Sequence, residues 1–240
     1  MKIAIIGYGK MGRIIAKLAE EAGHTIALII DRDNLEDLTP GRLAEAEVAI
    51  EFSLPESAVG NILACLEAGV PVVCGTTGWL ARLEEVKEQV SRCQGALFYA
   101  SNYSIGVNIF FAVNRYLARL MNGQPQYDVA LEEIHHTQKL DAPSGTAITL
   151  ANSILEEIER KQTWVAEAPP APGEIHIQSI RVGETPGTHQ IVYSSPVDSI
   201  AIRHEANSRE GFAKGALEAA RWLVGKQGVF GMEDMLGLAI

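Results

Sequence analysis

The chain has 240 residues, of which 47% are hydrophobic and 21% are charged, as in an ordinary globular protein. Its formal net charge of -10 argues against a nucleic-acid or anionic-membrane partner, because such partners select a basic face. Three widely spaced cysteines without a CxxC pair, and no apolar run of transmembrane length, favour a cytoplasmic protein with buried or incidental thiols.

The first hundred residues alternate short apolar runs with segments that carry apolar residues at helical spacing. The runs are rich in β-branched residues and predict strands, and the segments between them predict helices. Such alternation is typical of a parallel sheet with right-handed crossovers. The predicted strands are 2–6, 25–30, 48–52, 70–74 and 96–100, and the predicted helices are 10–22, 55–68 and 80–92, with only 31–44 looking irregular.

The rhythm changes after Asn102. We expect helices at 106–121, 145–161 and 208–224, a short terminal helix within 228–236, and strands at 127–134, 174–182, 189–194 and 199–204. The last three strands are joined by short turns and predict an antiparallel meander, whereas 166–173 is a proline-rich loop. The fold class is therefore α/β: a Rossmann-type doubly wound parallel sheet plus an α+β domain with a mixed, partly antiparallel sheet.

A glycine motif follows the first predicted strand. Gly7, Gly9 and Gly12 fit G-x-G-x-x-G, with Lys10 and Met11 between the last two glycines. The first glycine permits a tight turn, the second lets a pyrophosphate approach the backbone, and the third allows close packing of helix on strand. The motif therefore predicts a dinucleotide site, and the alternative is a glycine-rich turn without a ligand.

Asp31 ends the second predicted strand, 24 positions after Gly7, where an acidic side chain accepts hydrogen bonds from the adenosine ribose. It could instead be a helix cap or a surface charge. The neighbouring Arg32 could bind the 2′-phosphate of NADPH, which Asp31 would repel. Because the short carboxylate is better fixed than the flexible guanidinium, we expect NADH to be preferred and NADPH to be used as well.

Two further loops follow predicted parallel strands at their carboxyl ends, where ligands of open α/β sheets bind. One contains Gly75, Thr76 and Thr77, and the other Ala100, Ser101, Asn102 and Tyr103. Both could reach the nicotinamide, although each is also an ordinary turn by composition.

Two histidines and a lysine, His135, His136 and Lys139, precede a predicted helix start at Ser144, Gly145 and Thr146. Adjacent strand residues face opposite ways, so the two histidines are poor joint chelators, and we expect no metal site. The first amides and hydroxyls of the helix would bind a carboxylate. Lys139 would supply a positive charge and a proton, and one of the histidines would polarise the substrate. These roles describe a reductase for a small carboxylated compound.

The run E-I-H-H-x-x-K-x-D-A-P-S-G-T-A from Glu133 resembles the signature of the dihydrodipicolinate (4-hydroxy-tetrahydrodipicolinate) reductase family. The resemblance covers nearly the whole chain. It extends to the glycine motif, the GTTG loop, SNYSIGVN from Ser101, H-x-A-x-S-R-x-x-F-A-x-G-A-L from His204 and the terminal GVFGMEDML. The family implies NADH- or NADPH-dependent reduction of a cyclic imine dicarboxylate on the diaminopimelate route to lysine.

The resemblance also implies roles for individual residues. His135 and Lys139 match the catalytic pair, and His136, Ser144, Gly145 and Thr146 match the substrate-binding group. Residues 1–104, completed by helices within 212–240, would bind the dinucleotide, and 105–211 would bind substrate and form a homotetramer through its sheets. The implied cofactor contacts are Gly7, Gly12, Asp31, Gly75, Thr77 and residues 100–103.

Two departures from the family pattern stand out. Thr137 and Gln138 replace side chains that are often basic, and the chain is short after Asp31, which bears on the wall of the adenosine pocket. Two other functions remain open: a related two-domain dehydrogenase acting on aspartate or diaminopimelate, and a non-catalytic nicotinamide sensor. The His-His-x-x-Lys run with Ser-Gly-Thr argues against the first, and retention of His135 and Lys139 argues against the second.

Overall fold

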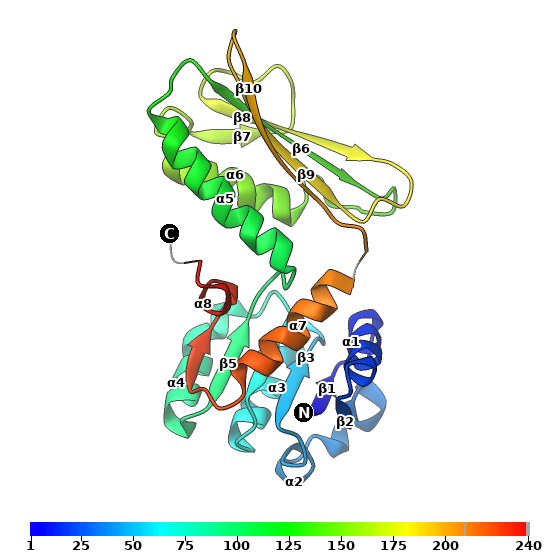
Figure 1. Ribbon diagram of the computed structural model, residues 1–240. Helices are drawn as coiled ribbons and strands as arrows, with labels where there is room; N and C mark the ends of the chain where they lie inside the picture. The colour runs from blue at the N-terminus through cyan, green and yellow to red at the C-terminus, as the bar shows by residue number, and fades with distance from the viewer. Residues whose placement is uncertain (209, 239–240) are drawn as a thin grey trace. The chain divides into compact units, whose positions relative to one another are not determined.

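The computed structural model describes residues 1–208 and 210–238, which divide into two units (Figure 1). Unit 1 contains Met1–Ile105 and the described residues from Glu210 onward, and unit 2 contains the described residues from Gly106 to 208. From the sequence we place the boundaries after 104 and 211. Arg209, part of the late motif, and residues 239–240 lie outside the described residues.

Six of the described strands of unit 1 form a parallel sheet in the order β11-β5-β4-β3-β1-β2. The order reverses direction at β1, which is the doubly wound arrangement expected from the sequence. The strands are β1 (Lys2–Ile6), β2 (Thr25–Ile30), β3 (Val48–Glu51), β4 (Val72–Cys74), β5 (Ala96–Tyr99) and β11 (Gly228–Phe230). The α-helices are α1 (Lys10–Glu21), α2 (Pro40–Leu43), α3 (Pro55–Glu67), α4 (Leu83–Cys93), α7 (Glu210–Leu223) and α8 (Met232–Leu236), and the 3-10 helices are η1 (Arg32–Asp37) and η2 (Leu80–Arg82).

Helices cover both faces of this sheet, which explains why its strands are near-continuous apolar runs. Every residue of β3 is buried, including Glu51. One core cluster joins the sheet to α3 and α4 through residues such as Ile62 and Val90, and another joins it to α1 and α7 through residues such as Ile15 and Ala216. Because all pairings in this sheet are parallel, the carboxyl ends of the strands lie at one edge, where the glycine turn follows β1.

Several predictions for unit 1 need correction. The terminal GVFGMEDML segment was expected to be a short helix, but only its second part is helical. Its first part, Gly228–Phe230, is a strand that pairs in parallel with β5 before α8 begins. The stretch after Asp31 is partly helical, with η1 and α2, and the helix expected at 80–92 begins as a separate 3-10 turn. Short elements of this kind carry too few residues for a periodic pattern to reveal them.

Five described strands of unit 2 form a mixed sheet in the order β10-β9-β6-β8-β7, with α5 (Ile105–Asn122) and α6 (Gly145–Glu157) on one face (Figure 1). The strands are β6 (Asp128–His135), β7 (Thr163–Val165), β8 (Glu174–Arg181), β9 (Thr188–Ser194) and β10 (Ser199–Glu205). The expected meander is wrong in part. Strand β9 pairs antiparallel with β10 and β6, but β8 pairs in parallel with β6 and β7.

The parallel pairing of β6 with β8 follows from the chain between them. A parallel connection needs a crossover of a dozen or more residues, and α6 supplies it. The crossover also contains β7, which sequence reasoning missed because it has only three residues before the proline-rich loop. Strand β6 alternates buried and exposed positions, so Leu131, Glu133 and His135 share the helix-covered face.

Among residues 1–208 and 210–238, no helix combines the length and apolar character needed to cross a membrane.

Candidate functional site

The turn after β1 places three glycines as a dinucleotide motif requires. Gly7 has a positive φ of 90°, and its amide donates to the Ile30 carbonyl at 2.8 Å. A Cβ on Gly7 would lie 2.1 Å from the Phe52 carbonyl oxygen, and one on Gly12 would lie 2.1 Å from the Gly7 carbonyl oxygen. In the described part of the chain, no atom lies within 4 Å of a Cβ built on Gly9. Gly7 and Gly12 therefore permit close packing, and Gly9 leaves its surface open.

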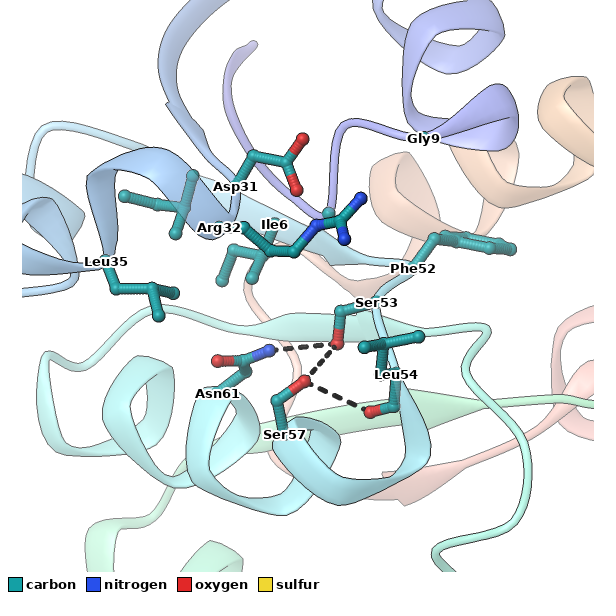
Figure 2. Close-up of a pocket in the computed structure, with 12 residues that line it drawn as sticks. Ile6, Gly9, Asp31, Arg32, Leu35, Phe52, Ser53, Leu54, Ser57 and Asn61 are labelled. Atoms are coloured by element: carbon teal, nitrogen blue, oxygen red, sulfur yellow. Dashed lines mark hydrogen bonds between the residues drawn. The ribbon is translucent and has the colours of Figure 1, made fainter.

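A cavity of about 380 Å³ lies beside this turn (Figure 2). This volume is within the usual range for a small-molecule site. Asp31 occupies the N-cap position of η1, and the Arg32 guanidinium extends into the space beside it. Leu35 of η1 forms one wall, so the short segment after Asp31 still closes the cavity. The lining residues are Ile6, Gly7, Gly9, Ile30, Asp31, Arg32, Leu35, Phe52, Ser53, Leu54, Ser57 and Asn61.

A second hollow of about 440 Å³ shares Gly9, Phe52 and Ser53 with the first. The lining residues are Gly9, Lys10, Met11, Phe52, Ser53, Pro55, Gly75, Thr76 and Thr77, so the structure brings both glycine-containing loops to it. A Cβ on Gly75 would lie 2.1 Å from Cζ of Phe52, and only glycine lets that ring lie against the loop. The two hollows therefore adjoin each other at these shared residues.

A buried polar network supports the floor of the first cavity, and sequence reasoning missed it. Glu51 is fully buried and accepts hydrogen bonds from the Ser53 amide, the Ser53 hydroxyl, Asn61 and the Cys74 thiol. Asn61 also donates to Ser53 Oγ at 3.0 Å, and this Ser53 oxygen lies 3.1 Å from Ser57 Oγ (Figure 2). Burial, and then the Glu51 charge, raise the pKa of Cys74 far above its usual value. The network fixes the hydroxyls that face the cavity.

The loop of residues 100–103 follows β5, next to the carboxyl end of β4, but these four residues do not line either hollow. The Ala100 amide donates to the Cys74 carbonyl at 3.3 Å. Tyr103 is buried, and its hydroxyl donates to the same carbonyl at 2.7 Å. The Tyr103 side chain therefore packs in the core. The roles of Ala100, Ser101, Asn102 and Tyr103 in cofactor binding stay predictions.

In unit 2, the predicted catalytic histidine ends strand β6. His135 is 8% exposed, and its Nδ1 forms a hydrogen bond with the Oε2 of fully buried Glu133. The other carboxylate oxygen of Glu133 accepts from Arg181 Nη2 at 2.7 Å. Burial alone would raise the pKa of Glu133, but the hydrogen bonds from His135 and Arg181 outweigh it and lower that pKa to about 2. Glu133 is therefore an ionised acceptor.

Ser144 begins helix α6 and connects it to the same cluster. Its Oγ accepts from the Ala147 amide at 3.2 Å, as an N-cap does, and lies 3.1 Å from Nε2 of His189. The His189 ring contacts His135 edge-on, with centroids 5.2 Å apart. Burial, and then the neighbouring His135, lower the pKa of His189 to about 3. This imidazole is therefore neutral near pH 7.

Lys139 lies in the loop between β6 and α6. Its Nζ contacts both carboxylate oxygens of Asp141 at 2.8 Å, and its amide donates to the His136 carbonyl at 3.1 Å. The hydrogen bond from Lys139 holds the pKa of Asp141 below its usual value. Arg181 also donates to the Asp141 carbonyl at 2.6 Å, which ties this loop to Glu133.

The structure thus gathers most predicted residues of unit 2 around a connected set of side chains. His135, Lys139 and Ser144 belong to it, half-buried His136 follows His135, and Gly145 and Thr146 open α6. Sequence reasoning missed the other members: Glu133, Asp141, Arg181 and His189. The strand period could have revealed Glu133, because it precedes His135 by two residues. His189 and Arg181 carry no such signal, since strand pairing alone brings them close.

Glu133, His135 and His189 bring one potential ligand atom each within 4.8 Å of the others. The carboxylate oxygens are already engaged by His135 and Arg181, and the guanidinium supplies the positive charge that a cation would add. These hydrogen bonds account for the cluster, and the absence of a metal stays a prediction.

A Rossmann-type unit combined with a separate mixed-sheet unit is the build of two-domain oxidoreductases that use a nicotinamide cofactor. Solved structures agree at the level of the fold: apo scyllo-inositol dehydrogenase from Lactobacillus casei is 12% identical, with a TM-score of 0.52 over 99% of this chain and 92% of its own. Family models are more specific. Residues 1–103 match the model described as dihydrodipicolinate reductase, N-terminus, and residues 106–236 match the one described as dihydrodipicolinate reductase, C-terminus. The chain belongs to the dihydrodipicolinate reductase family and is an oxidoreductase.

Individual relatives agree with this assignment. The 4-hydroxy-tetrahydrodipicolinate reductase of Christiangramia forsetii is 45% identical over 240 residues, which cover 98% of each chain. That of Methanoregula boonei is 34% identical over 258 residues, 99% of this chain and 98% of its own. A solved dipicolinate-bound dihydrodipicolinate reductase from Paenisporosarcina is 25% identical, with a TM-score of 0.73 and 98% coverage of both chains. Because the first relative aligns over nearly its full length, the short form of this chain is shared within the family.

Proposed function

We propose that the protein reduces 4-hydroxy-tetrahydrodipicolinate (dihydrodipicolinate) to tetrahydrodipicolinate on the diaminopimelate route to lysine, with His135 and Lys139 as its catalytic pair. One observation carries the proposal. In unit 2, His189 contacts both His135 at the end of β6 and Ser144 at the start of α6. It does so although His189 lies 45 residues from Ser144 in the sequence. This arrangement combines proton-donating groups with a helix start suited to a carboxylate.

The cofactor would bind in unit 1, and the residues present fit it. A Cβ at Gly7, Gly12 or Gly75 would clash with backbone or ring atoms, whereas the surface at Gly9 is open, as a pyrophosphate site requires. Lys10, Met11, Thr76 and Thr77 line the adjoining hollow and would contact the other half of the dinucleotide. Bound NADH or NADPH would supply the hydride.

NADH is the preferred cofactor in this proposal. The carboxylate of Asp31 would accept hydrogen bonds from both ribose hydroxyls and repel a 2′-phosphate. Arg32 lines the same cavity and opposes this effect, because its guanidinium would attract the phosphate. The guanidinium is flexible and screened by salt, so it would reduce the preference without reversing it.

The substrate would bind in unit 2 through its two carboxylates. The amides of Gly145 and Thr146 fall in the first turn of α6, where backbone N–H groups lack intrahelical acceptors. These amides and half-buried His136 would hold one carboxylate. Ser144 contributes as the N-cap that orients this turn, because its hydroxyl accepts from the Ala147 amide.

Lys139 and His135 would assist the proton transfer to the substrate that accompanies hydride transfer. The Lys139 ammonium is paired with Asp141, so the substrate carboxylate would compete with Asp141 for it. Once turned toward the substrate, the ammonium stabilises developing negative charge and donates a proton. His135 would polarise the substrate from the other side of the cluster.

The assembly proposed is a homotetramer through the sheets of unit 2, in the cytoplasm. Helices α5 and α6 cover one face of this sheet (Figure 1). The other face carries apolar side chains at alternating positions, including exposed Ala130 and half-buried Ile134 on β6 and half-buried Val192 on β9. Pairing of such faces between copies would bury them. Sedimentation analysis gives the number of copies, and a monomer at micromolar concentration would contradict this part.

The test of the reaction is an assay with the reduced cofactor and substrate generated by the preceding synthase. We expect substrate-dependent loss of reduced-nicotinamide absorbance with NADH and, more slowly, with NADPH. The same protein given an oxidised cofactor with aspartate or diaminopimelate separates the related dehydrogenases. Cofactor binding without turnover on any of these substrates would favour a sensor.

A further inference from the structure

The side chain beneath His135 is a fully buried carboxylate. Glu133 precedes His135 by two residues on β6, so both side chains lie on the helix-covered face of the sheet. A buried carboxylate is costly unless its oxygens are satisfied, and this one has two partners, Nδ1 of His135 and Nη2 of Arg181. The arrangement therefore constrains the histidine as much as it stabilises the carboxylate.

We propose that Glu133 is a positioning residue that holds His135 in the tautomer with a proton on Nδ1, so that Nε2 is the nitrogen offered to the substrate. The inference rests on the proposed role of His135 in reduction. An ionised carboxylate can only accept, so the nitrogen facing it must carry a hydrogen. The second ring nitrogen, Nε2, is then left for chemistry.

The opposite edge of the ring is kept clear by a glycine. A Cβ on Gly187 would lie 3.0 Å from Nε2 and 3.3 Å from Cδ2 of His135. Gly187 has a φ of 153°, a conformation that side-chain-bearing residues rarely adopt. One edge of the imidazole is thus anchored on Glu133, and a methyl group on Gly187 would crowd the other.

Arg181 links Glu133 to the loop that carries Lys139, the second residue of the proposed catalytic pair. Its Nη2 donates to Glu133 Oε1 at 2.7 Å and to the Asp141 carbonyl at 2.6 Å. Asp141 in turn holds the Lys139 ammonium. Because one guanidinium contacts both sides, it sets the spacing between His135 and the loop that carries Lys139.

The decisive variant is Glu133→Gln, which keeps the shape and removes the charge. We expect kcat to fall about 10- to 100-fold, the usual cost of removing a partner that orients a functional histidine, with KM for NADH unchanged. Glu133→Asp, which keeps an acceptor, should recover part of this loss. Glu156→Gln is the control, because it removes the charge of an exposed, ion-paired carboxylate of unit 2 that lies outside this cluster.

The tautomer is measured without catalysis, by nitrogen NMR of the histidine-labelled, ligand-free protein with His135 assigned from His135→Asn. We expect the wild-type signal to report a proton on Nδ1, and Glu133→Gln to report a mixture or the other tautomer. If Glu133→Gln fails to fold, Arg181→Lys, which keeps the charge but loses the second hydrogen bond, gives the same comparison. An unchanged tautomer together with unchanged kcat overturns the inference. A wild-type protein that shows the expected tautomer but reduces no substrate leaves the positioning intact and refutes the proposed function.

Discussion

Ser144 Oγ lies 3.1 Å from Nε2 of His189, so the residue that begins α6 is held by a side chain from β9. Ser144 is 2% exposed and also accepts from the Ala147 amide. If Nε2 of His189 carries the hydrogen, it donates to Ser144 and leaves the serine proton for a ligand. The neutral state of His189 is therefore part of the helix start that would bind the substrate.

The buried His189 predicts a specific loss of stability in acid. Its pKa falls from 6.5 in the unfolded chain to about 3 in the folded protein, chiefly by burial. Between these values the unfolded state binds the extra proton, so stability is complete above pH 6.5 and decreases as the pH falls toward 3. One proton contributes a slope of about 1.4 kcal/mol per pH unit. Denaturant unfolding of wild type and His189→Gln over this range measures the difference.

Ser144→Ala is the matched control for that comparison. It removes the hydroxyl but keeps the imidazole, so we expect a loss of about 1 kcal/mol at every pH, as for other N-caps, with the slope retained. Parallel curves for wild type and His189→Gln would show that His189 is not buried in its neutral form.

Lys139→Ala should lower turnover by roughly 100-fold or more, the size usual for the loss of a general acid. Affinity for NADH should barely change, because Lys139 belongs to unit 2 and the glycine turn to unit 1. Steady-state kinetics and cofactor titration separate the two effects. The exposed, ion-paired Lys214 provides the control, and Lys214→Ala should behave as wild type. Near-normal turnover with weakened NADH binding in Lys139→Ala would contradict the assignment.

Gly9→Ala and Gly12→Ala should fail in different ways. A methyl at Gly9 meets open space in the described structure, so the protein should fold normally but bind NADH more weakly where the pyrophosphate approaches. A methyl at Gly12 would lie 2.1 Å from the Gly7 carbonyl, and the resulting overpacking should cost about 1–3 kcal/mol or more. Thermal unfolding with and without NADH distinguishes them. Unchanged NADH affinity in Gly9→Ala would place the cofactor elsewhere.

The cofactor preference tests the balance between Asp31 and Arg32, which line the same cavity. We expect NADH to be favoured by on the order of 1–2 kcal/mol, or about ten- to thirtyfold in kcat/KM. Asp31→Ala should erase the preference, and Arg32→Ala should sharpen it by weakening NADPH. Kinetics with both cofactors on the three proteins measure these changes. A wild-type enzyme that favours NADPH tenfold would show that Arg32 dominates.

Much of unit 1 could be predicted because its signals are local. The apolar strand runs, the helical spacing after Gly9 and the glycine positions each depend on neighbours in the chain. The network beneath the cavity could not be predicted in the same way. Glu51 lies inside an apolar strand, and only folding brings Asn61 and Cys74 to its two oxygens. The burial of Tyr103 could not be predicted for the same reason, since a position in a loop does not reveal the core that packs around its ring.

By itself, the sequence determined the fold class of unit 1, the family, and the residue types at the end of β6 and the start of α6. Each of these features depends on residues that are close together in the chain. Tertiary structure alone decided that β8 lies parallel to β6 and that β11 completes the first sheet, since strand pairing depends on contacts between distant segments. It also decided that Glu133 and Arg181 anchor His135 while His189 holds Ser144. Hydrogen bonds require atoms within about 3 Å, and spacing along a chain does not report which strands will bring them that close.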